Sequence, residues 1–95
     1  MMPSILNNAV TVSTTAILLC DGQPRRTWLV LTNNGSVTVY LGNVSVTTSA
    51  FLIALPAGES LQVTNGDGND KAPENKWYGV TASSTASVSV GESLN

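Results

Sequence analysis

Short runs in which apolar and polar residues alternate recur along this chain, and turn residues separate them. Val10 and Val12 alternate with hydroxyl residues, and the same period of two returns at 37–41, 60–64 and 85–90. This period places one face of a β-strand in a core and the other in solvent. No segment keeps the 3.6-residue period of a helix over ten residues. Val, Thr and Ile, which favour strands, supply about a quarter of the chain.

Eight or nine strands follow from this pattern, and a single sheet of that size would leave its apolar face uncovered. Two packed antiparallel sheets or a closed barrel would cover that face. We predict an all-β fold, a compact antiparallel β-sandwich of about eight short strands that is jelly-roll-like and has no significant helix. The strand order stays open. The expected strands cover residues 10–13, 16–20, 27–32, 37–41, 44–46, 51–55, 60–64, 77–82 and 85–90.

The strand at 16–20 is a continuous apolar run and is predicted to be covered on both faces, and the strand at 27–32 is again apolar on both faces. The second is placed in the centre of a sheet, with Trp28 in the core. The sequence Asn-Asn-Gly follows at 33–35. It predicts a hairpin, because these residue types tolerate a positive φ.

The first and last predicted strands, 10–13 and 85–90, contain no charged residue and no Pro. Soluble sandwiches usually protect their edge strands with Lys, Pro or bulges. Two interpretations therefore stay open. Either these strands lie inside their sheets, or a neighbouring subunit pairs with them.

The length of 95 residues corresponds to one small domain. We expect an N-terminal arm over residues 1–8, the sandwich over 9–91 and a C-terminal tail over 92–95, with one long polar loop at 65–76. No targeting segment is recognised, and the longest apolar run is far too short to span a bilayer. The chain is therefore expected to be soluble and made without Sec export.

Charged side chains are scarce, at 11% of the residues, and the formal net charge is -2. A nucleic-acid-binding surface needs clustered basic residues, so this balance argues against one. The absence of His excludes His-based triads and His metal sites, and the single Cys excludes an internal disulfide and a multi-Cys zinc site. We expect no enzyme activity and no cofactor. A role in binding or assembly is expected instead, with neighbouring subunits covering part of the surface.

The long loop contains a possible calcium-binding pattern, because oxygen-bearing side chains alternate along it. Asp70 stands where the EF-hand pattern needs Gly, and Lys76 stands where it needs a bidentate Glu. The same residues favour turns, so a simple loop is the other interpretation. We predict no metal site, and the calcium candidates in the loop are Asn65, Asp67, Asn69 and Asp70.

Several residues are candidates for contacts with a partner. Trp77 and Tyr78 form either an aromatic platform or part of the core, where the Trp of a small sandwich usually lies. Arg25 and Arg26 either meet a carboxylate patch on a partner or lie in solvent at the entrance of a strand. Cys20 is expected to be a small buried hydrophobe. The N-terminal arm contributes Met1, Met2, Pro3 and Ile5.

A longer pattern begins in residues 24–42. A basic pair begins a strand, an Asn-x-Gly turn follows, and the next strand ends in Val-Tyr-Leu-Gly. Further parts are Val-Thr-Thr-Ser at 46–49, Leu-Pro-Ala-Gly-Glu-Ser at 55–60, Trp-Tyr-Gly-Val-Thr-Ala at 77–82 and Thr-Ala-Ser-Val-Ser-Val at 85–90. Over residues 9–91 the chain resembles the small β-sandwich virion proteins of tailed bacteriophages. It departs from their pattern at Trp28, where a smaller aliphatic residue is usual, and in its long polar loop.

The resemblance implies a structural virion protein, expected first as a head decoration (cement) protein that binds the outside of the head and stabilises it. Strand edges and the arm would bind the major capsid protein or other virion proteins, with no nucleic acid and no membrane bound. The location would be the virion, assembled in the host cytoplasm. The alternatives are a tail, neck or fibre component and a receptor- or carbohydrate-binding module that uses Trp77 and Tyr78. A homo-oligomer is expected, with a trimer as the guessed state.

Overall fold

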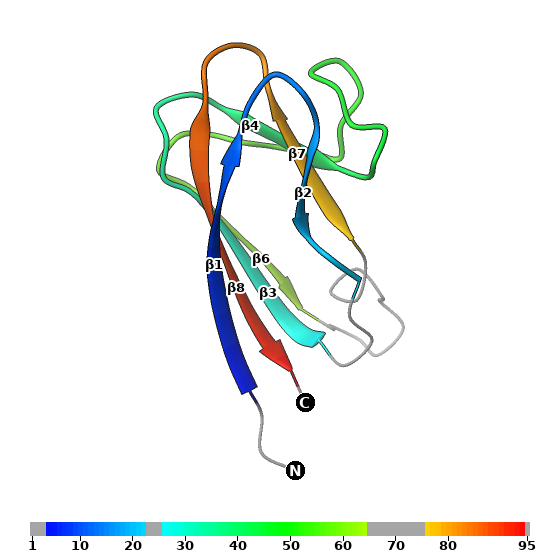
Figure 1. Ribbon diagram of the computed structural model, residues 1–95, viewed down its shortest axis with the longest axis vertical. Coiled ribbons are helices and arrows are strands. Elements are labelled where there is room, and N and C mark those ends of the chain that lie inside the picture. The colour runs from blue at the N-terminus through cyan, green and yellow to red at the C-terminus, as the bar shows by residue number, and fades with distance from the viewer. Residues whose placement is uncertain (1–3, 23–25, 65–75, 95) are drawn as a thin grey trace.

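The computed structural model describes residues 4–22, 26–64 and 76–94. Within these residues the chain forms eight strands, all paired antiparallel, in two four-stranded sheets with the orders β1-β8-β3-β6 and β2-β7-β4-β5 (Figure 1). The strands are β1 (Ser4–Val12), β2 (Ile17–Cys20), β3 (Arg26–Asn33), β4 (Val39–Gly42), β5 (Ile53–Leu55), β6 (Ser60–Thr64), β7 (Trp77–Thr81) and β8 (Ala86–Leu94).

The strand order is that of a jelly roll. The pairs β1·β8, β2·β7, β3·β6 and β4·β5 are those of one long hairpin folded over on itself. The further pairs β3·β8 and β4·β7 join the rolled ribbon into two sheets. This arrangement confirms the predicted antiparallel sandwich and supplies the strand order that the sequence left open.

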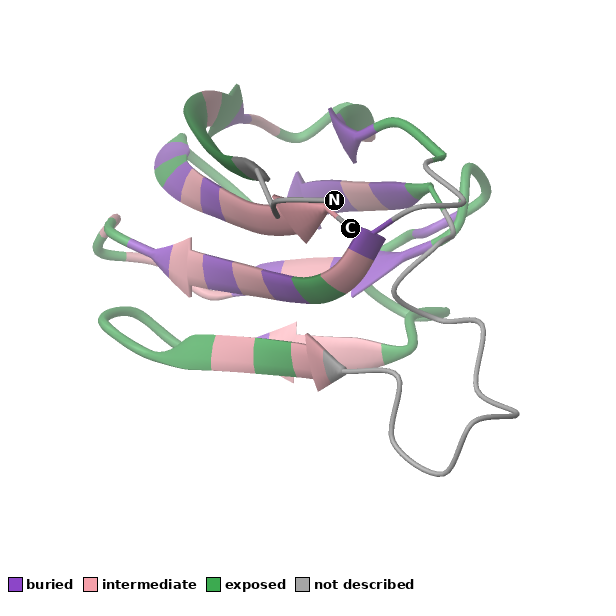
Figure 2. Cartoon of the chain, turned by 90° about the horizontal axis from the view of Figure 1, so that it is seen from below, coloured by how far each residue is buried: buried purple, intermediate pink, exposed green. Residues whose placement is uncertain are grey.

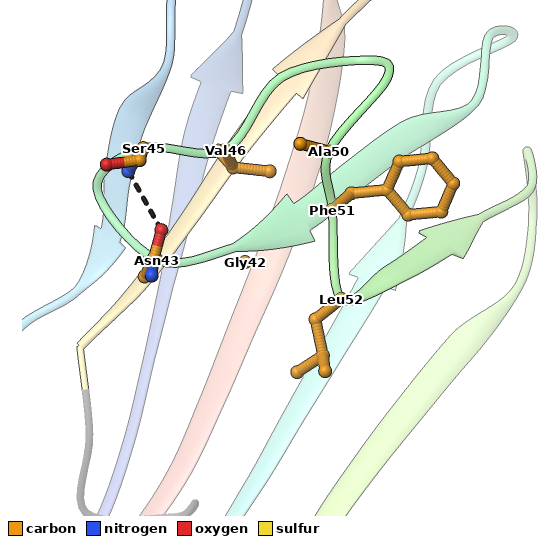
Figure 3. A pocket seen from close by; sticks show the side chains of 7 residues that line it. All are labelled: Gly42, Asn43, Ser45, Val46, Ala50, Phe51 and Leu52. Carbon is orange, nitrogen blue, oxygen red and sulfur yellow. Dashed lines mark hydrogen bonds between the residues drawn. The ribbon is translucent and has the colours of Figure 1, made fainter.

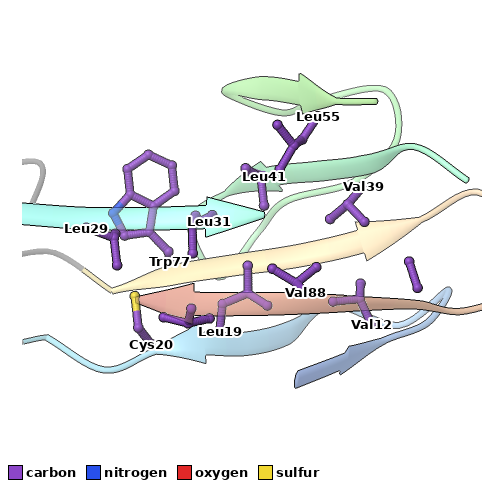
Figure 4. Close-up of a cluster of buried hydrophobic side chains, with 12 residues drawn as sticks. Val12, Leu19, Cys20, Leu29, Leu31, Val39, Leu41, Leu55, Trp77 and Val88 are labelled. Atoms are coloured by element: carbon purple, nitrogen blue, oxygen red, sulfur yellow. The ribbon is translucent and has the colours of Figure 1, made fainter. Parts of the chain in front are cut away.

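The core fills the space between the two sheets (Figure 4). Alternate residues of β3 and β8 point into it, so Leu29, Leu31, Val88 and Val90 are buried. The alternation is visible as purple and pink stripes along the strands in Figure 2. Burial of each large apolar side chain contributes about 1.5–3 kcal/mol, so this layer is the main stabilising element. The facing sheet contributes Leu19, Cys20, Val39, Leu41, Leu55 and Trp77.

The segment at 33–35 does not form the predicted hairpin, because β3 and β4 lie in different sheets. The Asn33 side chain is fully buried at this crossing. Its Nδ2 donates to the carbonyl oxygens of Val37 at 2.8 Å and Leu55 at 2.9 Å, and its Oδ1 accepts from the Gly35 amide at 2.9 Å. The residue types that favour tight hairpins thus form a local Asx turn here, which joins one sheet to the other.

Two strand predictions were wrong. Residues 44–46 form a turn in which the Val46 amide donates to the Asn43 carbonyl oxygen at 3.0 Å. β2 is an edge strand, and Ile17 and Leu18 are 40% and 37% exposed, so it is not covered on both faces. A continuous apolar run indicates coverage on both faces only when a third layer is present, and this sandwich has two layers.

The central position predicted for β3 is confirmed, because it lies between β8 and β6. The core position predicted for Trp28 is wrong, because its side chain is 41% exposed. Trp28 alternates with Leu29, and in a strand successive side chains point to opposite faces. Leu29 occupies the core, so Trp28 lies on the outer face of the sheet.

The sheet extends beyond both expected domain boundaries. β1 begins at Ser4 and pairs with β8 without a register shift as far as Leu94. Residues 4–8 of the expected arm and 92–94 of the expected tail therefore belong to one antiparallel pair. The alternation did not reveal this part of β1, because the adjacent residues Ile5 and Leu6 are both apolar. β8 lies inside its sheet and β1 lies at the edge.

Candidate interaction surface

The outer face of the β1-β8-β3-β6 sheet is the most distinctive surface of the described chain, and we term it the neutral face. The registers Ile5↔Ser93, Trp28↔Ser93 and Val30↔Gln62 fix which side chains share it. No charged residue occurs on it among the residues described. Its members are Ile5, Asn7, Ala9 and Thr11 of β1, Ser87, Ser89, Gly91 and Ser93 of β8, Trp28, Val30 and Thr32 of β3, and Ser60 and Gln62 of β6.

Small side chains line one inner strand of the neutral face. β8 lies between β1 and β3 and presents three serines and Gly91 there. Larger groups flank this strip near the end of the sheet where both termini lie (Figure 1), with Ile5 80% exposed on one side of Ser93 and Trp28 41% exposed on the other. Interface cores are depleted in charge and enriched in aromatic residues, so this composition is typical of a surface that another protein covers.

A second exposed apolar group lies in the segment 43–52, which we term the apolar loop. It connects β4 to β5 and lies at the opposite end of the molecule from the termini (Figure 1). Val44 is 66% exposed, Phe51 44% and Leu52 71%. A shallow hollow of about 330 Å³ opens beside the loop (Figure 3), lined by Gly42, Asn43, Ser45, Val46, Ala50, Phe51 and Leu52.

Local contacts hold the apolar loop in place. Val46 is buried against Gly42, where an added Cβ would lie 3.1 Å from a Val46 methyl carbon. The rings of Phe51 and Tyr40 pack with their centroids 4.9 Å apart. The loop is therefore a fixed protrusion over the outer face of the second sheet.

Arg26 does not lie where a partner could reach it. Its side chain is 1% exposed and forms a salt bridge with Glu92, in which Nε donates to Glu92 Oε1 at 2.6 Å. Its Nη2 also donates to the Asp21 carbonyl oxygen at 2.6 Å. The predicted partner contact of Arg26 is therefore wrong.

A β-bulge explains the inward position of Arg26. The register of β3 against β8 shifts between Arg26 and Trp28, so Arg26 lies opposite Leu94 while Trp28 lies opposite Ser93. The extra residue, Thr27, places Arg26 and Trp28 on opposite faces of the sheet. In a regular strand two residues this far apart would share a face.

Trp77 is 5% exposed and belongs to the core, so the predicted aromatic platform is wrong for this residue, and the alternative core position is confirmed. Tyr78, the next residue of β7, is half-buried. Cys20 is 6% exposed, which confirms it as a small buried hydrophobe. Burial raises the pKa of the Cys20 thiol above its ordinary value, and the nearby positive charge of Arg26 opposes this only in part.

Of the remaining candidates, Ile5 lies on the neutral face, as described above. The others, Met1, Met2, Pro3, Arg25, Asn65, Asp67, Asn69 and Asp70, lie outside the described residues.

Sequence reasoning missed the exposure of Trp28 and of the apolar loop. The exposure of Trp28 could have been predicted from Thr32. Residues four positions apart in a strand share a face, and the polar residue Thr32 indicates that this face meets solvent. The exposed Val44, Phe51 and Leu52 had no comparable signal, because isolated apolar residues near turns are common in both strands and loops.

Among the described residues, no three His, Cys, Asp or Glu side chains gather as possible metal ligands. The described part of the chain contains no helix that is long and apolar enough to cross a membrane. Searches against models of protein families and against curated proteins find no match for this chain. The inference of function therefore depends on the surfaces described above and on the pattern in the sequence.

Proposed function

We propose that this chain is a non-enzymatic structural protein of a tailed-phage particle, and most specifically a decoration protein that binds the outside of the head. The neutral face is the observation that carries the proposal. It presents a sheet surface without charge among the described residues, on which Trp28 and Ile5 are the exposed large apolar groups. The pattern at residues 24–42, which resembles small virion proteins, points to the same role.

Such a face suits attachment to a large protein assembly. Docking would desolvate hydroxyl and amide groups but no charge, and leaving a buried charge unpaired is the most costly outcome at an interface. A capsid repeats one binding surface many times, so a small rigid domain needs only moderate affinity at each site. Low net charge limits repulsion between crowded copies.

Two ion pairs among the described residues are in keeping with a structural role. The Arg26–Glu92 pair is engaged inside the fold, and Lys76 and Asp21 lie 3.8 Å apart at an exposed position. Neither pair lies beside the hollow at the apolar loop. Binding to the major capsid protein would stabilise the head by mass action, without any chemical step.

Attachment to the tail, neck or fibre would use the same face with fewer copies. A carbohydrate-binding role is the second candidate, and it moves from Trp77 to Trp28, which is exposed and lies opposite Ser93 of β8. A change in fluorescence on titration with oligosaccharides, absent in the Trp28→Phe variant, would favour that role over decoration.

The decoration proposal is tested by adding the purified protein to heads assembled without it. We expect saturable binding by the native chain and a loss of affinity of at least about 30-fold for Trp28→Lys, because an unpaired charge would replace the large apolar group on the docking face. Leu52→Lys is the matched control, since Leu52 is 71% exposed at the other end of the molecule. Equal binding by both variants and the native chain would reject the neutral face as the docking surface.

A further inference from the structure

The sandwich has four edge strands, and β1 differs from the other three. β5 has three residues, β2 has four and a register shift, and β6 has five. β1 has nine residues and pairs with β8 in an unbroken register. It contains no charged residue, no Pro and no Gly. Natural sheets shorten, bulge or charge their edges to prevent pairing, so β1 lacks the usual protection.

β1 also exposes large apolar side chains on both faces of its sheet. Ile5 is 80% exposed on the neutral face, and Leu6 is 47% exposed on the inner face. A partner lying flat on the neutral face would cover Ile5 and leave Leu6 in water. A strand placed alongside β1 would contact both residues, because it continues the sheet on both faces.

We propose that β1 pairs antiparallel with β1 of a second copy of this chain, across a two-fold axis perpendicular to the sheet at Asn8. In this register Leu6 lies opposite Val10 of the second copy, and Ile5 lies opposite Thr11. The two four-stranded sheets then continue as one, and the two neutral faces form a single larger face. The geometry favours a two-fold pair in place of the trimer expected from the sequence.

The sequence of the strand suits a second copy as the occupant. In this register residues near Asn8 approach their own copies, so a charge there would meet a like charge. β1 contains no charged residue, although the chain has a formal net charge of -2. Pairing two copies through β1 therefore brings no charge of this strand into the contact. Opposite residues also share a face of the sheet in this register. The exposed apolar residues Leu6 and Ile5 therefore lie beside the β-branched residues Val10 and Thr11 of the second copy.

This inference does not depend on the phage assignment, and it is tested with the purified chain alone. Sedimentation equilibrium should give about twice the chain mass of 9.9 kDa at high concentration, with dissociation on dilution. Leu6→Lys should weaken the pair by at least roughly 100-fold, because the dimer carries the substitution twice. Leu52→Lys, the matched control, should leave the mass unchanged. A monomer at all concentrations, a trimer, or a dimer that survives Leu6→Lys would overturn the proposal.

The register has its own test. Asn8→Cys places two cysteines at the two-fold axis, where directly opposite Cα atoms lie about 4.5–5.5 Å apart, within the range of a disulfide. Mild oxidation should therefore link the Asn8→Cys chains in pairs. In the Thr11→Cys control the two cysteines would lie about 20 Å apart and should not link. The native chain measures the background of cross-linking, which should be low because its one cysteine, Cys20, is buried. Efficient linking of Thr11→Cys, or none of Asn8→Cys, would reject the register.

Discussion

Replacing Glu92 by Gln should remove a large part of the stability of this fold. The Glu92 side chain is 18% exposed, whereas its partner Arg26 is only 1% exposed. Glu92→Gln keeps the size of the side chain and removes the negative charge of the Arg26–Glu92 salt bridge from the buried guanidinium. Breaking a buried ion pair in this way costs about 3–5 kcal/mol, and partial exposure of Glu92 favours the lower end, about 3 kcal/mol. The total free energy of unfolding of a domain of this size is only about 5–14 kcal/mol.

Replacing Arg26 and replacing Glu92 should not cost the same free energy of unfolding. Arg26→Met leaves Glu92, which water reaches in part, so this change should cost less than Glu92→Gln. The double variant Arg26→Met/Glu92→Leu removes both charges of this pair and should return to within about 1 kcal/mol of the native chain.

Urea unfolding followed by the fluorescence of the buried Trp77 measures all three variants. Glu92→Gln should also lower Tm by roughly 12–24 °C. A loss below about 1 kcal/mol for Glu92→Gln would show that water already screens the pair. A double variant as unstable as the sum of the single changes would show that the two side chains are not coupled.

Three further changes test the interior. Asn33→Leu should cost about 2–3 kcal/mol in thermal unfolding, because three backbone groups lose their side-chain partner, through one buried and two partly buried hydrogen bonds; an unchanged Tm would contradict that role. Gly35→Ala should destabilise the fold, since its Cβ would lie 2.5 Å from the Ala86 Cβ, and an equal urea midpoint would refute this. Burial raises the pKa of Cys20 above its ordinary value of 9.0, so the folded state holds the proton more tightly. Stability from this group is complete below that pH and falls as pH rises above it. Cys20→Ala should remove that fall in urea midpoint between pH 8 and pH 10, and an identical decline in both chains would refute it.

The sequence predicted the two-layer fold because alternation records which side chains face a core. It did not predict the strand order, since the partner of a strand depends on contacts between distant residues. The bulge at Thr27 has no sequence signature here, and it places Arg26 on the buried face, opposite to the face of Trp28. The prediction for 33–35 failed for a related reason, because the same residues suit a hairpin and a crossing between sheets.

The candidate surface was only partly predictable. Ile5 was expected to contact a partner, and it lies exposed on the neutral face. The neutral face itself requires the registers of four strands, and no local pattern contains them. The scarcity of charge in the whole sequence indicated that uncharged surface had to exist, but not where it would gather.

The central claim is that this chain is a repeated component of a phage head. Quantitative mass spectrometry of purified virus particles from its source would measure the number of copies per copy of the major capsid protein. Decoration of the head predicts on the order of hundreds of copies in each particle, in a fixed ratio to the capsid protein. A handful of copies would place the chain in the tail, neck or fibre, and its absence from the particle would contradict a structural role in the virion.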